Sequence, residues 1–211
     1  MIRLLAHRGL WTTPAEKNAP DALRTSFERG FGVETDLRDR LGSLVVSHDP
    51  PTEDALAATD LVSWADGSGA PVAVNVKSDG ISGALTELFA GRDVDWFAFD
   101  MSVPETVRYR AAGLPYLTRH SDVEPDPVLY PEAAGVWLDA FHSDWFGPDE
   151  VQRHLDAGKR VAVVSPELHG RDPDRAWDWV AALDQQLGTD RELMVCTDHP
   201  DRLLARLEDR S

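Results

Sequence analysis

Short apolar runs alternate with longer segments of mixed polarity along this chain. The runs are rich in Val, Leu and Phe, which is typical of strands that are buried on both faces of a sheet. We expect strands in residues 3–6, 32–37, 44–47, 72–76, 96–99, 114–117, 136–138, 160–164 and 193–196.

The segments between these runs have the features of helices. Several of them begin with a proline or an acidic residue, which suits the first turn of a helix. Several end just before a glycine, which is a common signal for the end of a helix. Helices are predicted over residues 20–29, 81–90, 104–112, 148–157, 174–187 and 201–209.

Alternating strands and helices predict βαβ units and a parallel sheet. The run 44–47 follows 32–37 after too few residues for a parallel crossover, so we interpret it as a hairpin that continues the second strand. The other eight runs favour a closed (β/α)8 barrel, the TIM barrel, over an open flavodoxin-like sheet. We expect one domain that spans residues 1–211.

Composition and charge exclude several classes of protein. Among 211 residues, Asp and Glu outnumber Lys and Arg by 37 to 21, which gives a formal charge of −16. Such a charge argues against a surface for nucleic acid or anionic lipid. The single cysteine, Cys196, excludes an internal disulfide and a thiolate zinc site. No run is long enough for a transmembrane segment, and the apolar start is too short for a secretory signal, so we expect a cytoplasmic protein.

Polar side chains follow the predicted strands, at the end of a parallel barrel where active sites lie. Glu34 and Asp36 are two positions apart in one strand, so both carboxylates leave the same face. Two carboxylates this close repel each other unless a positive group lies between them. A divalent cation such as Mg²⁺ or Ca²⁺ would supply that charge, whereas a solvated acidic patch is the alternative.

Four further residues at strand ends have chemistry suited to a phosphate ester. His7 and His48 follow different strands, and two imidazoles can act as general base and general acid near neutral pH. Arg8 follows His7, and its guanidinium can hold a phosphate through two hydrogen bonds. Lys77 follows the third strand and can neutralise charge on a phosphoryl oxygen.

Together, these residues resemble the motifs of the glycerophosphodiester phosphodiesterase family, within the superfamily of phosphatidylinositol-specific phospholipase C-like phosphodiesterases. The stretches that carry the resemblance, in order, are Ala6-His7-Arg8-Gly9, Asn18, Glu34-Thr35-Asp36-Leu37, Ser47-His48-Asp49 and Asn75-Val76-Lys77. Later stretches around Asp100, Glu167 and Asp198 look like a compact bacterial branch of this superfamily.

The resemblance implies a barrel, a divalent metal (Mg²⁺ or Ca²⁺) and two-histidine acid–base chemistry on a small phosphodiester. It implies that His7 and His48 are catalytic and that Arg8 and Lys77 bind the phosphate. The implied metal ligands are Glu34, Asp36 and Asn75.

The chain departs from the family pattern at three points. Lys17 stands where the family has a glutamate, and Asn75 stands where it has the third acidic ligand. Asp79, Asp100 and Glu167 are candidates to replace the charge that Asn75 lacks. The family's inserted subdomain has no counterpart, because only residues 50–70 follow the His48-Asp49 pair before the third strand.

The expected function is therefore a metal-dependent phosphodiesterase that acts on a small glycerophosphodiester-like substrate. One alternative is a cyclising phosphodiester lyase or an enzyme for phosphodiester-linked glycans. Another is a phosphate-binding barrel that has lost turnover through Asn75 and Lys17. The sequence leaves the alcohol groups and the oligomeric state open.

Overall fold

A computed structural model describes residues 2–188 and 191–209 of the chain. The chain forms two compact units. The N-terminal unit is Leu5–Tyr116, and the C-terminal unit combines Met1–Leu4 with Leu117–Ser211. The expectation of a single domain over residues 1–211 stays a prediction.

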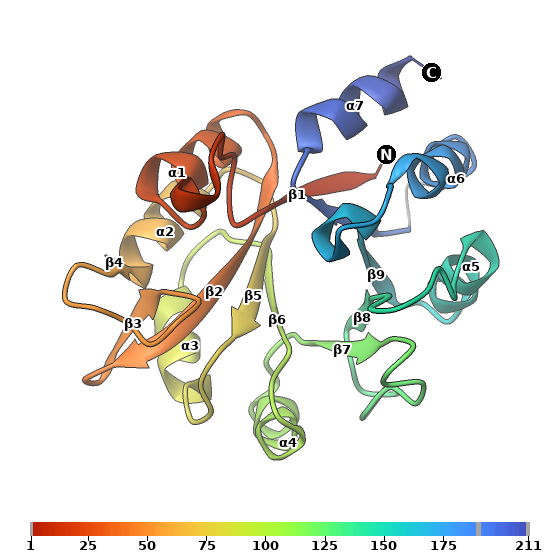
Figure 1. Ribbon diagram of the computed structural model, residues 1–211. Coiled ribbons are helices and arrows are strands. Elements are labelled where there is room, and N and C mark those ends of the chain that lie inside the picture. Colours follow the sequence, from red (N-terminus) through yellow and green to blue (C-terminus); the bar gives the residue numbers. More distant parts are fainter. Residues whose placement is uncertain (1, 189–190, 210–211) are drawn as a thin grey trace. The chain divides into compact units, whose positions relative to one another are not determined.

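The N-terminal unit is built on parallel strands (Figure 1). The parallel order is β1, β2, β5, β6, and β3 adds an antiparallel partner to the end of β2. The pairing of Leu37 with Val46 confirms the hairpin that the short gap predicted. The strands are β1 (Arg3–His7, which enters this unit at Leu5), β2 (Gly32–Arg40), β3 (Ser43–Val46), β4 (Leu56–Ala57), β5 (Val72–Val76) and β6 (Trp96–Phe99).

The α-helices of this unit contact one another in chain order, from α1 to α4. They are α1 (Pro20–Glu28), α2 (Ala58–Ala65), α3 (Ser82–Phe89) and α4 (Val103–Ala112), with a short 3₁₀ turn η1 (Pro14–Glu16) before α1. The sequence analysis missed α2. Its buried side chains have helical spacing, which is the signal that identifies it: Ala58, Leu61, Val62 and Ala65.

The C-terminal unit repeats the same alternation. Its four strands are parallel and pair in chain order, β7 with β8, β8 with β9, and β9 with β10. They are β7 (Leu117–His120), β8 (Gly135–Leu138), β9 (Arg160–Val164) and β10 (Leu193–Thr197). The helices are α5 (Pro148–Asp156), η2 (Pro166–His169), α6 (Asp174–Asp184) and α7 (Pro200–Glu208).

The strand expected over residues 114–117 is wrong in its position, because β7 begins at Leu117. The preceding residues are divided between two neighbours, because Leu114 completes the end of α4 while Tyr116 forms an isolated parallel bridge with Ala98 of β6. Gly113 has a left-handed φ of 67°, and the backbone N–H of Leu114 donates to the carbonyl of Tyr109. This C-terminal turn accounts for Leu114, the first apolar residue that the pattern assigned to the strand.

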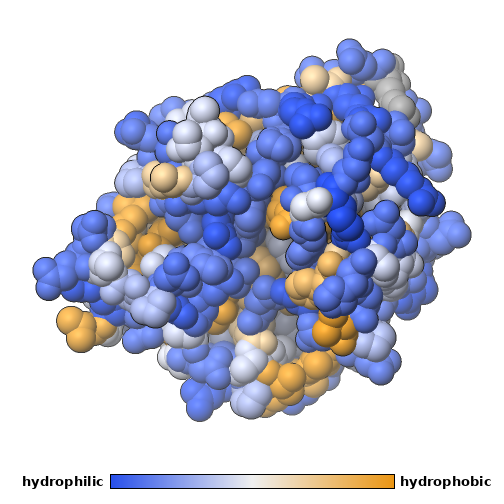
Figure 2. Space-filling model, in the orientation of Figure 1, coloured by the Kyte–Doolittle hydropathy of each residue, from blue (hydrophilic) through white to orange (hydrophobic). Residues whose placement is uncertain are grey.

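Apolar side chains fill the strands of both units, as the sequence pattern predicted. The surface that Figure 2 displays is largely hydrophilic, in keeping with the charge of −16. Of the helices in the described ranges, none is both long enough and apolar enough to cross a membrane. Two acidic residues of β2 are exceptions to this apolar core. Glu34 and Asp36 are only 2% and 0% exposed.

Candidate active site

The turn after β1 fixes the backbone of Arg8 from both sides. The N–H of Arg8 donates to the carbonyl of Glu34, and the carbonyl of Arg8 accepts from the N–H of Asn18, both at 2.8 Å. Arg8 and Gly9 have left-handed φ angles of 58° and 89°. A Cβ on Gly9 would lie 2.7 Å from the backbone of Ala22, so only glycine fits between this turn and α1.

Strand β2 presents two carboxylates toward its parallel neighbours. Glu34 pairs in register with His7 of β1, and Asp36 pairs with Asn75 of β5. Both side chains leave the same face of β2, as their spacing predicted. The pairing therefore brings a histidine, two carboxylates and an amide together within the N-terminal unit.

Asp36 is fully buried and lies between two cations. Arg8 Nε is 3.0 Å from its Oδ2, and Lys77 Nζ is 3.2 Å from its Oδ1. Asn18 donates its Nδ2 hydrogen to the same Oδ2 at 2.8 Å. Asp36 therefore lies at the centre of the cluster, in contact with two cations and an amide donor.

Glu34 has a less favourable environment than Asp36. Burial raises the pKa of Glu34, and the neighbouring charge of Asp36 raises it further, while His7 acts in the opposite direction. His7 Nε2 lies 3.8 Å from Glu34 Oε2, and Asn75 Nδ2 lies 3.4 Å from Glu34 Oε1. A buried carboxylate with such weak compensation is the type of group that a cation stabilises.

Asn75 lies in β5 and contacts a carboxylate on each side, Glu34 in β2 and Asp100 after β6. Its Nδ2 also donates to Asp100 Oδ2 at 3.2 Å. Asp100 follows β6 directly and has a left-handed φ of 64°. Among the three acidic residues considered as replacements for the missing ligand charge, Asp100 is the one that contacts Asn75.

The other two acidic candidates have different partners. Asp79 accepts from the hydroxyl of Ser102 at the start of α4, at 2.7 Å. Glu167 belongs to the C-terminal unit, where it accepts from the hydroxyls of Ser165 and Thr197 and from the N–H of Asp198. These contacts give both carboxylates local structural roles.

His48 is held near Asp36 through the backbone. The N–H of Ser47 donates to the carbonyl of Asp36 at 3.0 Å, which continues the β2–β3 hairpin by one residue. The His48 side chain is 46% exposed, and its Nδ1 lies 3.0 Å from Asp49 Oδ1. The structure thus brings His7 into the carboxylate cluster, whereas the His48 ring is exposed and contacts Asp49.

Three oxygen atoms fit the metal that the resemblance implies. Glu34 Oε2, Asp36 Oδ1 and Asn75 Oδ1 are buried and have no hydrogen-bond partner among the residues that the structure describes. The Asp36 atom faces the Lys77 ammonium, but the other two have only weak compensation. Carboxylate and amide oxygens suit a hard cation such as Mg²⁺ or Ca²⁺.

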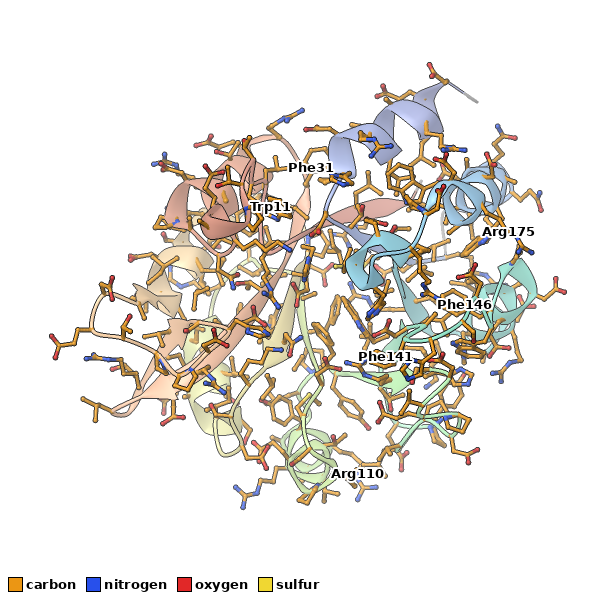
Figure 3. The ribbon with its side chains drawn as sticks, viewed as in Figure 1. Trp11, Phe31, Arg110, Phe141, Phe146 and Arg175 are labelled. Carbon is orange, nitrogen blue, oxygen red and sulfur yellow. The ribbon has the colours of Figure 1, made fainter. Side chains whose placement is uncertain are left out.

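Trp11 and Lys17 lie on the loop between β1 and α1, where Figure 3 labels Trp11. The indole Nε1 of Trp11 donates to the carbonyl of His7 at 3.0 Å. Lys17 Nζ lies 4.4 Å from the centre of the Trp11 ring, in a cation–π contact. The residue that departs from the family pattern therefore adds positive charge beside the His7 backbone.

The C-terminal unit has its own polar cluster at the ends of its strands. Asp139 accepts from Arg119 Nη1 and lies beside His169 Nε2, both at 2.7 Å. Arg119 also stacks over Phe141, at 4.9 Å from the ring centre. His169, at the end of η2, is thus paired with a carboxylate of its own unit.

Two residues hold the cluster together: Asn18, to which the sequence analysis assigned no role, and Asp100, which it named as a candidate to replace the charge that Asn75 lacks. Asn18 accepts from the Thr35 hydroxyl at 2.8 Å while it donates to Asp36, so it bridges two adjacent residues of β2. Asp100 gains its role from the pairing of β5 with β6. Its position directly after an apolar strand was the available signal.

Comparison with known proteins identifies structures of the same fold. A phosphodiesterase from Oleispira antarctica, solved with its product sn-glycerol-3-phosphate, superimposes with a TM-score of 0.68 at 15% identity, over 98% of this chain and 96% of that one. A glycerophosphodiester phosphodiesterase from Agrobacterium tumefaciens gives a TM-score of 0.64 at 18% identity, over 97% and 100%. A Ca²⁺-dependent phosphatidylinositol-specific phospholipase C from Streptomyces antibioticus gives 0.56 at 12% identity, over 96% and 95%.

Sequence comparison adds nothing to this result, because no protein-family model and no curated protein sequence matches the chain. Dihydropteroate synthases are also similar in structure, so the fold by itself does not select a reaction. The predicted fold class is nevertheless confirmed: the chain has the α/β barrel fold of the glycerophosphodiester phosphodiesterases, the family that its motifs resemble.

Proposed function

We propose that this protein is a metal-dependent phosphodiesterase that cleaves a small, glycerophosphodiester-like substrate. One observation carries the proposal: the buried Asp36 carboxylate lies between Arg8 and Lys77, beside oxygens of Glu34 and Asn75 that are buried and have no hydrogen-bond partner among the described residues. Similarity to structures of phosphodiesterases supports the reaction class.

The net charge of the cluster favours the binding of a cation, which must precede the binding of an anionic substrate. Glu34, Asp36 and Asp100 are three acidic groups, whereas Arg8 and Lys77 are two positive ones. With all three acids ionised, the excess is negative and would repel a phosphodiester. A divalent cation reverses the sign, and when bound it would polarise a phosphoryl oxygen.

We propose Glu34, Asp36 and Asn75 as the residues that hold this cation. All three supply oxygen atoms from the paired strands β2 and β5. An amide oxygen in place of a carboxylate removes one negative charge, so we expect weaker binding than in a site with three carboxylates. Mg²⁺ and Ca²⁺ remain the two candidates.

Arg8 and Lys77 are proposed to bind the phosphate. Their side chains are 22% and 21% exposed, so each is accessible while it remains paired with Asp36. A guanidinium has five N–H donors and an ammonium has three, so both keep donors for a phosphate after bonding to Asp36. Asp36 therefore positions the two cations as well as the metal.

His7 and His48 are proposed as the acid–base pair. One imidazole removes the proton from the attacking hydroxyl, of water or of the substrate, and the other protonates the leaving alkoxide. The carboxylate of Glu34 lies 3.8 Å from His7 Nε2 and faces this ring. If a substrate hydroxyl attacks, the first product is a cyclic phosphate, as in the lyase alternative.

The test is hydrolysis of bis(p-nitrophenyl) phosphate and glycerophosphocholine by chelator-stripped protein, with Mg²⁺, Ca²⁺ or Mn²⁺ added back. We expect metal-restored turnover that falls at least roughly 100-fold in His7→Ala and in Asp36→Asn. The matched controls are His142→Ala and Asp39→Asn, because both residues are exposed and Asp39 lies in the same strand as Asp36.

Each outcome of this test selects one hypothesis. Turnover of the synthetic diester alone would retain the chemistry and reject the glycerol-type alcohol. A cyclic phosphate product would favour the lyase. Folded protein without turnover of either diester, with metal binding also absent by calorimetry, would favour the phosphate-binding barrel. The expected cytoplasmic location stays a prediction, which cell fractionation would test.

A further inference from the structure

Three metal-ligating side chains converge in the C-terminal unit, at the end of β7 and on α5. They are His120, Glu150 and His154, and one donor atom of each lies within 4.8 Å of the others. Glu150 and His154 are four residues apart and so share one face of α5. His120 is the last residue of β7 (Figure 1). The proposed phosphodiesterase chemistry uses none of these residues.

The spacing of the three donor atoms matches the edge of a tetrahedron around a small cation. His120 Nδ1 lies 3.1 Å from His154 Nε2, and Glu150 Oε1 lies 3.3 Å from each of these nitrogens. Ligand atoms about 2.0–2.1 Å from a tetrahedral Zn²⁺ are about 3.3–3.4 Å apart. The observed triangle therefore has the size that such an ion requires.

Hydrogen bonds outside the triangle orient both rings toward its centre. The His120 ring hydrogen-bonds the backbone of Pro125, which has only a carbonyl to offer, so the ring must donate there. The neutral ring then directs a lone pair from Nδ1 into the triangle. Tyr130 Oη lies 2.9 Å from His154 Nδ1, which leaves His154 Nε2 as the inward atom. Such outer contacts are typical of metal-binding histidines.

The alternative is a metal-free hydrogen-bond network, and it leaves one contact unsatisfied. The contact between His120 Nδ1 and Glu150 Oε1 joins two acceptors when His120 is neutral and Glu150 is ionised.

We infer that His120, Glu150 and His154 form a binding site for a borderline divalent metal ion of the zinc class. Two imidazoles and one carboxylate are the donor set that Zn²⁺ accepts, whereas Mg²⁺ and Ca²⁺ prefer oxygen alone. The side chains of His120 and His154 are 7% and 1% exposed, and Glu150 at 22% provides access from solvent. Arg153 also pairs with Glu150 through its Nε, at 3.2 Å from Oε2.

Isothermal titration of the chelator-stripped full chain with Zn²⁺ tests this inference. We expect one equivalent to bind in wild type and in Glu34→Gln, which removes a carboxylate from the N-terminal cluster. Glu150→Gln and His120→Asn should each weaken that binding by more than the roughly 10–100-fold that loss of an outer partner costs. Asp149→Asn is the control, because this exposed residue precedes Glu150 on the same helix.

Zinc binding that persists at wild-type strength in Glu150→Gln or in His120→Asn would overturn the inference. So would the absence of zinc binding to wild type. If His120→Asn does not fold, the visible spectrum of the Co²⁺-loaded wild type decides the question. Intense bands of tetrahedral cobalt with nitrogen ligands are expected, and the weak spectrum of octahedral cobalt would contradict the site. Both readouts are independent of phosphodiesterase activity.

Discussion

Asn75 donates to the carboxylate of Asp100 at 3.2 Å, while its own Oδ1 is buried without a hydrogen-bond partner in the described part of the chain. The amide is thus oriented by an acidic neighbour, with its oxygen left available. Orientation of this kind compensates in part for the charge that an asparagine lacks as a metal ligand. It also places the Asp100 carboxylate next to Asn75.

Asn75→Asp tests whether this position holds a metal. The added charge should tighten binding of Mg²⁺ or Ca²⁺ by roughly tenfold. In metal-free protein, the new carboxylate faces Asp100 and Glu34, so the free energy of unfolding should fall by about 1–3 kcal/mol. Calorimetric titration and denaturant unfolding measure the two effects. Gln186→Glu is the exposed control, and unchanged metal affinity in Asn75→Asp would exclude Asn75 as a ligand.

Glu34→Gln should stabilise the metal-free protein near neutral pH. Burial raises the pKa of Glu34, so its ionised form is disfavoured in the folded state and the wild type loses stability as pH rises through that pKa. Glutamine has the same shape without the charge, and removing such a functional-site cost commonly gains about 0.5–2 kcal/mol. The advantage should shrink as the pH falls, because wild-type Glu34 then becomes neutral.

Denaturant unfolding at pH 5 and pH 8, in the presence of chelator, measures this difference. The same variant should bind divalent cations more weakly than wild type, so added Mg²⁺ or Ca²⁺ should reverse the order of stability. A variant that is less stable than wild type at both pH values would contradict the unfavourable environment of Glu34. Glu28→Gln, at the end of α1, is the exposed control.

Asn18 should be replaceable by glycine at a smaller cost than by alanine. Both variants lose the hydrogen bonds to Thr35 and Asp36, which should lower the free energy of unfolding by about 1–3 kcal/mol. Asn18 has a left-handed φ of 62°, which asparagine and glycine adopt readily. Alanine should therefore cost a further 1 kcal/mol or so. Equal stability of the two variants would indicate that the backbone relaxes around this position.

Much of the fold was predictable because buried strands have mostly apolar sequences. The apolar run that became β9 is continuous after Arg160, and the run that became β5 is interrupted only by Asn75. The few residues between Leu37 and Val46 allow only a hairpin. The position of β7 was not predictable from hydropathy, because the apolar residue Leu114 belongs to the turn that ends α4 and not to the strand. The buried residues of helix α2 have clear helical spacing. The helix was missed because it lies in residues 50–70, which were interpreted only as the place where the family's inserted subdomain has no counterpart.

The candidate site was predictable in its residue types and only partly in its contacts. The period of two in β2 placed Glu34 and Asp36 on one face, and the structure agrees. That Arg8 and Lys77 both pair with Asp36 depends on the register of three strands, which no local pattern encodes. The cluster of His120 and His154 was missed for the same reason, since it forms only when β7 packs against α5.

Gly9→Ala should be the most damaging single change in the turn that carries Arg8. An added Cβ would lie 2.7–2.9 Å from backbone atoms of Ala22 and Leu23, and φ at this position is 89°. Gly30 is the matched control, because it has a φ of 78° but no atom within 4 Å of the position that an alanine Cβ would occupy. Both variants incur the cost of a left-handed alanine, about 1 kcal/mol, so their difference isolates the steric clash with α1.

We expect Gly9→Ala to lower the free energy of unfolding by at least about 2 kcal/mol more than Gly30→Ala does. Relief of the clash must displace the turn from α1, and Arg8 moves with it because its N–H and carbonyl are both hydrogen-bonded across the turn. Metal-dependent turnover should therefore fall in Gly9→Ala even at temperatures where the variant remains folded. Denaturant unfolding and initial rates on bis(p-nitrophenyl) phosphate measure the two effects separately. Equal losses of stability in the two variants would mean that the turn can shift away from α1 at little cost, and the rigid placement of Arg8 beside Asp36 would then be wrong.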